Sequence, residues 1–224
     1  MVGVNWPTMC GRFAITLPPD AMAQLFSALP ANDLPPVPNY NVCPTDPVHA
    51  ILVEGERRLQ SLRWGFLPHW AKSPTDGPPL INARAETVAE KPAFRDAIRA
   101  RRCLIPADGY FEWTKDAEGN RLPWFIRPEH EGPFAFAGLW QDWERDGQAI
   151  RACAIVTCAA VGAPEALHHR MPVVVKPQDW ALWLGEEGKG AARLMQPTET
   201  VTWHRVGRDV NSNRSEGAGL IAPV

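Results

Sequence analysis

The chain of 224 residues has no long hydrophobic run, no secretion signal and no paired cysteines. Its apolar runs fall short of the roughly 18 residues that span a bilayer. Its first eight residues lack the basic flank and apolar centre of a signal peptide. Five cysteines without a C-x-x-C pair argue against a disulfide framework or a zinc site. We therefore expect a cytoplasmic protein without membrane association, bound metal or cofactor.

The chain also has little net charge. At −2, the field of the whole molecule does not favour nucleic acid. Local clusters of arginines could still bind phosphates, because screening limits each charge to a range of about 10 Å. Two such clusters comprise Arg95, Arg99, Arg101 and Arg102, and then Arg205, Arg208 and Arg214. Solvated helix and loop faces are the commoner explanation for such residues.

Proline and tryptophan, by contrast, are abundant. The 23 prolines are scattered, which favours many short elements joined by turns and argues against a long helical bundle. The ten tryptophans are expected mostly in the core, with some available to stack on unpaired bases. Hydrophobic residues at 45% and charged residues at 21% are typical of a globular chain with a sizeable core.

Hydrophobic periodicity predicts a strand-rich α+β fold in a single domain. Helices are predicted over 18–29, 92–102 and 177–184, and a proline-rich loop over 32–39. Strands are predicted over 49–53, 59–66, 103–105, 124–126, 134–140, 152–159, 172–175 and 201–206. With no internal repeat, we expect one unit whose loops carry the chemistry.

Cys10 is the first candidate for chemistry. It follows Met9, and if translation starts there, removal of that methionine leaves Cys10 with a free α-amine. Such an amine has a pKa of about 7.7–8.0, so a substantial fraction is unprotonated near neutral pH. It can condense with an aldehyde to a Schiff base, which the thiol closes to a five-membered thiazolidine. The alternative is a buried cysteine that acts only as a small apolar residue.

Asn82 and Glu112 could assist a nucleophile. The Asn82 amide could donate to an oxyanion or hold a sugar hydroxyl, or it could merely satisfy its own turn. Glu112 stands between two aromatic residues, a setting that excludes water and suits acid–base catalysis. A strand-end glutamate facing water is the alternative. The neighbouring Trp113 could stack on a base or fill the core.

His168 and His169 are candidate proton carriers, because histidine titrates near pH 7. Adjacent histidines are expected to point in different directions, so at most one should work, and both could simply be loop residues. Arg84 and Glu86, two apart, would share a strand face and could pair with each other. From the residues alone, this set also fits a thiol hydrolase with an oxyanion-stabilising amide.

Six motifs in order resemble the SRAP family, the SOS-response-associated peptidases also described as abasic-site processing proteins. They are MCGRFA at 9–14, YNVCPT at 40–45, RWGFLPHWAK at 63–72, INARAET at 81–87, CLIPADGYFEW at 103–113 and LHHRMPV at 167–173. The resemblance covers essentially the chain from Met9 onward. It implies a distorted, barrel-like, mainly antiparallel sheet flanked by short helices.

The resemblance also implies an activity. An N-terminal cysteine forms a thiazolidine with abasic sites in single-stranded DNA, protecting them during the DNA damage response, with lyase or self-peptidase character. The implied catalytic residues are Cys10, Asn82, Glu112 and His168. The implied DNA-binding residues are Arg12, Asn41, Arg84, Trp113 and Arg170. A monomer is expected that needs no cofactor and associates with the nucleoid when it is bound to DNA.

This sequence departs from the family at its start, because eight residues precede Met9. We expect residues 1–8 to be a non-native or misassigned extension and residues 9–224 to form the SRAP-like domain. If the extension stays attached, the Cys10 nitrogen is part of a peptide bond and cannot form a thiazolidine. Two alternatives remain: a thiol peptidase or amidohydrolase using Cys10, and a non-catalytic module that binds single-stranded DNA.

Overall fold

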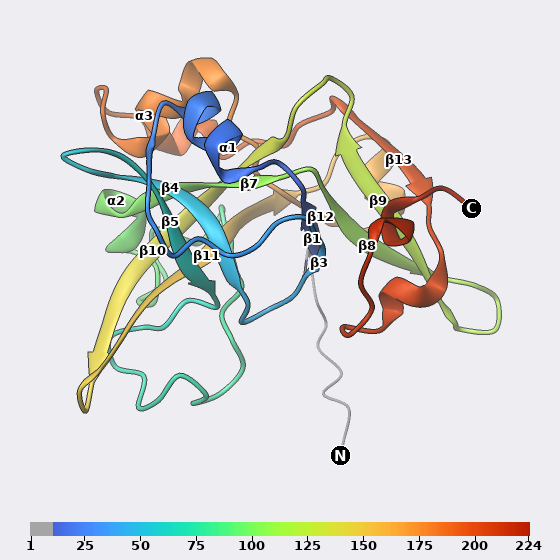
Figure 1. Ribbon diagram of the computed structural model, residues 1–224, viewed down its shortest axis with the longest axis horizontal. Helices are drawn as coiled ribbons and strands as arrows, with labels where there is room; N and C mark the ends of the chain where they lie inside the picture. Colours follow the sequence, from blue (N-terminus) through green and yellow to red (C-terminus); the bar gives the residue numbers. More distant parts are fainter. Residues whose placement is uncertain (1–10) are drawn as a thin grey trace.

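A computed structural model describes residues 11–224 of the protein. The predictions for Cys10 and for the extension over residues 1–8 therefore fall outside the described residues. The elements run from β1 near residue 13 to η5 near the C-terminus and form two sheets with short helices around them (Figure 1).

Five long strands close into a barrel. β4 (Pro47–Glu54) and β5 (Glu56–Trp64) form one hairpin, and β10 (Phe134–Arg145) and β11 (Gln148–Ala159) form another. β7 (Arg102–Ala107) pairs with both β4 and β10, and a parallel pairing of β11 with β5 closes the ring. The other pairings around this ring are antiparallel, so the predicted barrel-like, mainly antiparallel sheet is confirmed.

A second sheet packs beside the barrel, and all of its pairings are antiparallel. Its strands in order are β13 (Val201–Arg205), β9 (Arg121–Pro128), β8 (Gly109–Lys115), β1 (Phe13–Ile15) and β3 (Asn39–Val42). One face adds Phe13, Tyr110 and Ile126 to the main core. The other face buries Phe111 and Phe125 with residues near the C-terminus. Both faces of this sheet are thus covered.

Short elements complete the two sheets. β2 (Leu29–Pro30) extends β5, and β6 (Asn82–Arg84) and β12 (Arg170–Pro172) flank the end of β11. The α-helices are α1 (Pro19–Phe26), α2 (Ala97–Ala100) and α3 (Trp180–Leu184). The 3-10 helices are η1 (Ala163–Ala166), η2 (Pro177–Asp179), η3 (Ala191–Leu194), η4 (Arg208–Asn211) and η5 (Ala218–Ile221). No helix within residues 11–224 is long and apolar enough to cross a membrane.

Two predicted helices are shorter than expected. The helix over 18–29 ends at Phe26, because Ser27 takes a left-handed conformation (φ 51°) and Leu29–Pro30 then pair with β5. The helix over 92–102 is wrong for most of its length: only α2 is helical, after a series of turns. The helix over 177–184 is confirmed as η2 followed by α3.

The other predicted strands overlap β4, β5, β7, β9, β10, β11 and β13, but the strand predicted over 172–175 shares only Pro172 with β12. β8 was not predicted, because Tyr110, Phe111 and Glu112 are all buried and no alternation of apolar and polar residues marks one face. Gly109 begins this strand where a Cβ atom would lie 2.5 Å from the Ile126 carbonyl oxygen. The close approach of β9 therefore requires a glycine in the DGYFEW motif.

His49 in β4 should make stability depend on pH. Its side chain is 3% exposed, and burial lowers its pKa to about 4 although a hydrogen bond with the Pro35 backbone opposes this. The unfolded chain, with a histidine pKa of about 6.5, takes up the proton first as the pH falls. The free energy of unfolding should thus drop by about 3 kcal/mol between pH 6.5 and 4.

Urea unfolding across this pH range checks the prediction. His49→Leu should remove that share of the dependence, because a leucine carries no proton in either state. Equal losses of stability in the wild type and the variant would contradict the assignment to His49.

Candidate active site

The pairing of β1 with β8 brings the start of the described chain next to Glu112. Phe13 lies opposite Tyr110 and Ala14 opposite Gly109, and the Phe111 amide donates to the Arg12 carbonyl oxygen at 3.0 Å. Continued by two residues, this register places Gly11 opposite Glu112. Gly11 is the residue bonded to Cys10, which itself lies outside the described residues.

Glu112 is 3% exposed, so the alternative of a strand-end glutamate facing water is wrong. It points to the face of β8 that also carries Tyr110, since side chains alternate along a strand. Its cross-strand neighbour in β9 is Trp124, whose indole donates to the Thr114 hydroxyl at 2.9 Å. A carboxyl group at this depth is shielded from bulk water, as expected of an acid–base group.

Trp64 connects this region to Asn82. Its fully buried ring packs on Phe13 of β1, with the two ring centroids 5.1 Å apart. Its indole nitrogen donates to the Ile81 carbonyl oxygen at 3.0 Å. Because Ile81 directly precedes Asn82, one side chain fixes both the start of β6 and the start of β1. The backbone that leads into Asn82 is therefore held by the same packing that holds β1, two residues after Gly11.

Arg84, Glu86 and Arg170 lie around the end of β11. Arg84 is exposed and lies opposite Thr157 in the parallel pairing of β6 with β11. The Arg170 guanidinium binds the Glu86 carboxylate through both terminal nitrogens, at 2.6 and 2.9 Å, and also donates to the Thr157 carbonyl oxygen at 2.6 Å. This hydrogen bonding lowers the pKa of Glu86. Glu86 thus pairs with Arg170 rather than with Arg84.

His168 lies on the loop between η1 and β12. Its Nδ1 lies 3.1 Å from the Arg170 amide nitrogen and 3.2 Å from the Arg170 carbonyl oxygen. Burial lowers the pKa of His168, although its backbone hydrogen bond with Arg170 opposes this, so the ring is neutral at pH 7. The rings of His168 and His169 lie side by side, with centroids 4.3 Å apart, instead of pointing in different directions.

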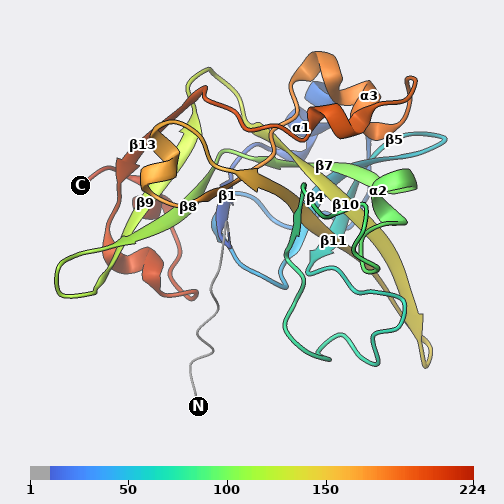
Figure 2. The same ribbon diagram turned by 180° about the vertical axis from the view of Figure 1, so that it is seen from behind.

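Arg12, Asn41 and Trp113 hold the segment formed by residues 208–215. Arg12 Nη1 donates to Asn41 Oδ1 at 2.6 Å and to the Val210 carbonyl oxygen at 2.9 Å. Asn41 Nδ2 donates to the carbonyl oxygens of Ser212 and Ser215, at 3.2 and 2.8 Å. The Trp113 indole donates to Asn211 Oδ1 at 2.7 Å. In Figure 1 this C-terminal segment lies in front of β8, and in Figure 2 it is seen from behind.

Comparison with known proteins places the chain in a family. Residues 9–213 match the SOS response associated peptidase (SRAP) family. The chain belongs to the SRAP family. The abasic site processing protein YoqW of Bacillus subtilis is 34% identical over 223 residues, covering 95% of this chain and 99% of that protein. YedK of Escherichia coli, with the same description, is 33% identical over 227 residues, covering 96% and 100%.

More distant matches come from sequence and from structure. The abasic site processing protein HMCES of Pongo abelii is 27% identical over 271 residues, covering 96% of this SRAP chain and 76% of that protein. A crystal structure of a protein from Bacteroides thetaiotaomicron superposes with a TM-score of 0.83 at 24% identity, covering 96% and 100%. A phage-related protein of Bordetella bronchiseptica gives 0.71 at 27% identity, covering 92% and 99%.

The segment over 208–215 and residues such as Trp64 and Arg121 were not identified from the sequence of this SRAP chain. The arginines near the C-terminus were a partial signal: Arg208 pairs with Asp116 at 3.2 Å, and Arg205 lies over the Trp124 ring. In the other arginine cluster Arg102 is structural, because it donates to backbone carbonyls at the end of α2 and to Trp183, whereas Arg95 and Arg99 are exposed.

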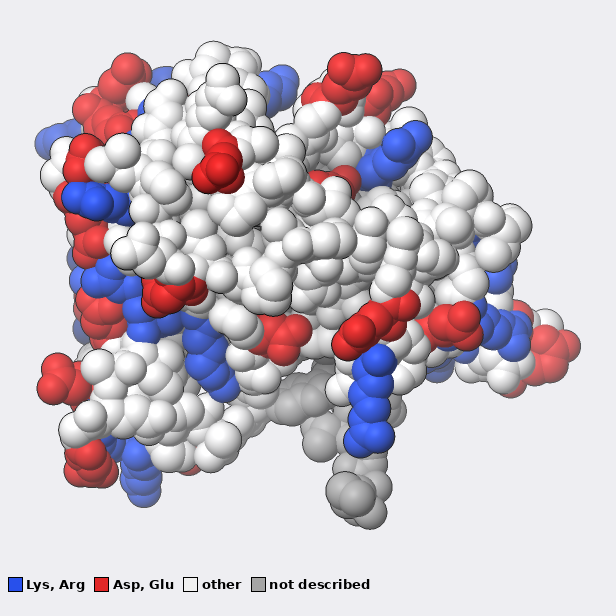
Figure 3. Space-filling view, in the orientation of Figure 1, with Lys and Arg blue, Asp and Glu red and all other residues white. Residues whose placement is uncertain are grey.

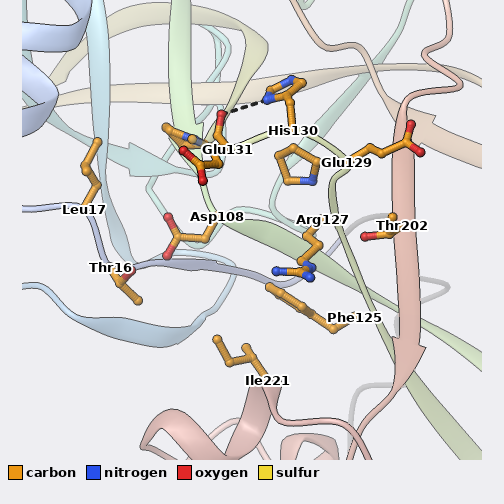
Figure 4. A pocket seen from close by; sticks show the side chains of 13 residues that line it. Thr16, Leu17, Asp108, Phe125, Arg127, Glu129, His130, Glu131, Thr202 and Ile221 are labelled. Carbon is orange, nitrogen blue, oxygen red and sulfur yellow. Dashed lines mark hydrogen bonds between the residues drawn. The ribbon is translucent and has the colours of Figure 1, made fainter.

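Charge is mixed over the SRAP surface. Lysines and arginines lie among aspartates and glutamates on the face shown in Figure 3, consistent with the net charge of −2. A cavity of about 530 Å³ lies at the opposite end of the β1–β8 pair, lined in part by Thr16, Asp108 and Arg127 (Figure 4). Burial raises the pKa of Asp108, against hydrogen bonds with Thr16. None of the expected site residues among 11–224 lines this cavity.

The described residues 11–224 contain no group of side chains placed to bind a metal ion. Within residues 11–224, no three His, Cys, Asp or Glu side chains are arranged to hold a metal ion. The four described cysteines, Cys43, Cys103, Cys153 and Cys158, are buried free thiols. Burial raises the pKa of each of them, to about 11 for Cys158. They are therefore protonated and weak nucleophiles near neutral pH.

Asn41→Ala should release the segment over 208–215. The variant loses both amide donors to that segment and the acceptor for Arg12, which should cost about 2 kcal/mol of unfolding free energy. Backbone amides over 208–216 should exchange hydrogen faster, which mass spectrometry measures. Asn32→Ala, at an exposed loop position, is the control and should change neither quantity. Unchanged exchange in Asn41→Ala would show that other contacts hold the segment.

Proposed function

We propose that this SRAP protein forms a covalent bond between Cys10 and abasic sites in single-stranded DNA. Its relatives are described as abasic site processing proteins, at up to 37% identity. The observation that carries the proposal is the register of β1 and β8, since a buried carboxyl group lies opposite the residue bonded to Cys10. The described cysteines are buried and protonated, which leaves Cys10 as the candidate nucleophile.

The chemistry requires both nucleophilic groups of Cys10. The abasic sugar must first open from its hemiacetal to the aldehyde, which needs proton transfer to and from oxygen. The α-amine then adds to the aldehyde carbon and water leaves, giving a Schiff base. The thiol sulfur adds to the same carbon while its proton passes to the nitrogen, and a thiazolidine results. These steps from aldehyde to thiazolidine balance without an oxidant or a metal ion.

Glu112 and His168 supply the proton transfers in this proposal. A buried carboxyl group next to the reacting carbon can protonate the departing water and accept the proton of the attacking amine. The neutral imidazole of His168 can take a proton from the sugar hydroxyl as the ring opens. Asn82, held through Trp64 and Ile81, orients the amine or the sugar oxygen for attack.

The proposed DNA-binding residues play different roles. Arg84 is exposed and can meet a phosphate directly. Arg170 is 10% exposed and bound to Glu86, so it shapes the wall of the site. Arg12, Asn41 and Trp113 hold the C-terminal segment as a second wall. Trp70, half exposed on the loop after β5, offers an indole face for an unpaired base.

A free Cys10 amine is part of the proposal. Either translation starts at Met9, where the match to the family also begins, or the first nine residues are removed by cleavage, including self-cleavage. Intact mass spectrometry of the protein from its native cell decides the point. A protein that keeps residues 1–8 and still crosslinks fully would sink the requirement for a free amine.

Cys10→Ala should abolish adduct formation. The protein with Cys10 at its N-terminus is mixed with single-stranded DNA carrying one abasic site and run on a denaturing gel, where a retarded band reports the covalent adduct. Cys158→Ala, which removes a buried thiol, is the control and should retain the band. Peptide cleavage without an adduct would favour a thiol hydrolase, and salt-sensitive binding without an adduct would favour a non-catalytic module.

Glu112→Gln and His168→Ala should slow the chemistry without weakening the binding. At saturating DNA, we expect adduct formation to slow by about 100-fold or more, because each variant removes a proton-transfer group. Affinity is measured separately with a strand that carries a tetrahydrofuran abasic analogue, which has no aldehyde. Parallel losses in rate and in affinity would instead assign both residues to DNA binding.

A further inference from the structure

Arg121 begins β9 beside the candidate site and is exposed. Its guanidinium lies over the ring of Trp113, 4.5 Å from the centroid, and that of Arg12 lies 5.7 Å from the same centroid. Both contacts follow from the sheet, because Arg12, Trp113 and Arg121 all point to the same face of β1, β8 and β9. One indole ring therefore positions two cationic groups.

Neither arginine of this pair forms an ion pair with a carboxylate in the part of the chain that the structure describes. Ion pairs within residues 11–224 engage Arg57, Arg58, Arg95, Arg151, Arg170 and Arg208, but neither Arg12 nor Arg121. Burial is the main cause that lowers the pKa of Arg121, and the charge of Arg12 lowers it further, while Glu112 opposes both. Two like charges at one ring repel each other, and an anion between them would relieve this repulsion.

The surroundings fix this arrangement before any ligand binds. Arg12 Nη1 is held by Asn41, and the Trp113 indole is held by Asn211. Asn211 also donates through Nδ2 to the Arg121 carbonyl oxygen at 3.3 Å, which ties the start of β9 to the same segment. A guanidinium stacked on an indole keeps its plane and its edge donors oriented, as recognition of a phosphate requires.

We propose that Arg121 and Arg12, stacked on Trp113, bind one backbone phosphate of the DNA strand. This inference rests on the proposed function, because the ligand is the strand that carries the abasic site. Arg12 follows Gly11 in the chain and Trp113 follows Glu112, so this phosphate site is adjacent in sequence to the proposed reaction centre, on the other face of the same strands. The bound phosphate then belongs to a nucleotide near the abasic sugar and limits where that sugar can lie.

Arg121→Gln should reduce the salt dependence of DNA binding. Each phosphate contact contributes a slope of about 0.7 in log Kd against log salt for a single strand, so the variant should lose about that much. Binding is measured by fluorescence anisotropy with a ten-nucleotide strand carrying a tetrahydrofuran abasic analogue, which cannot crosslink. Arg121→Lys, which keeps the charge, should retain most of the slope.

Arg127→Gln is the matched control, because Arg127 lies exposed on the same face and strand as Arg121 but at the other end of β9. It should keep the wild-type slope, and the thermal midpoints of all variants should agree. A wild-type slope in Arg121→Gln, with adduct formation intact, would overturn this inference alone. A wild-type protein that neither binds this strand nor forms an adduct would overturn the proposed function as well.

Discussion

The contacts of the Trp64 indole hold together the three segments on which the site depends. Its ring packs on Phe13, its indole nitrogen binds the Ile81 carbonyl oxygen, and its backbone bonds with Thr45 and Asp46 at 2.7 and 2.9 Å. β1, the residues before β6 and the turn after β3 thus share one buried partner. Trp64 also lies opposite Cys153 where β5 meets β11 and the barrel closes. The packing of Trp64 therefore contributes both to the closure of the barrel and to the placement of the candidate site.

The second sheet separates two tasks by the alternation of its side chains. Along β8, Glu112 faces the main core, while Trp113 faces the C-terminal segment together with Arg12, which directly precedes β1. A register shift of β8 by one residue would exchange these two faces and bury the Trp113 indole where the carboxyl group now lies. Gly109 protects this register, because it allows β8 to approach Ile126 closely. The proposed acid–base group and the proposed anion-binding groups are consequently neighbours in sequence but lie on opposite faces.

The sequence predicted the long strands well, because β4, β5, β10 and β11 carry apolar runs with clear ends. It did not predict β8, since burial on both faces removes the alternation that marks a strand. Motif order located the family and its residues, but not their partners: the bond of Glu86 to Arg170 joins residues 84 positions apart. The segment over 208–215 is held largely through its own backbone carbonyls, so its side chains carry only a partial signal. Long-range pairing and backbone acceptors are what a pattern of residues cannot show.

The sparse positive charge of this protein is compatible with its proposed chemistry. Several arginines near the site are already engaged, Arg170 by Glu86 and Arg208 by Asp116, and the net charge is −2. Few phosphates can then be neutralised, so reversible binding of an intact strand should be weak and should depend only shallowly on salt. A covalent bond removes the need for tight reversible binding, because retention after reaction no longer depends on the dissociation rate. Selectivity for an abasic site then lies in the aldehyde itself, the group that Cys10 requires and that intact DNA lacks.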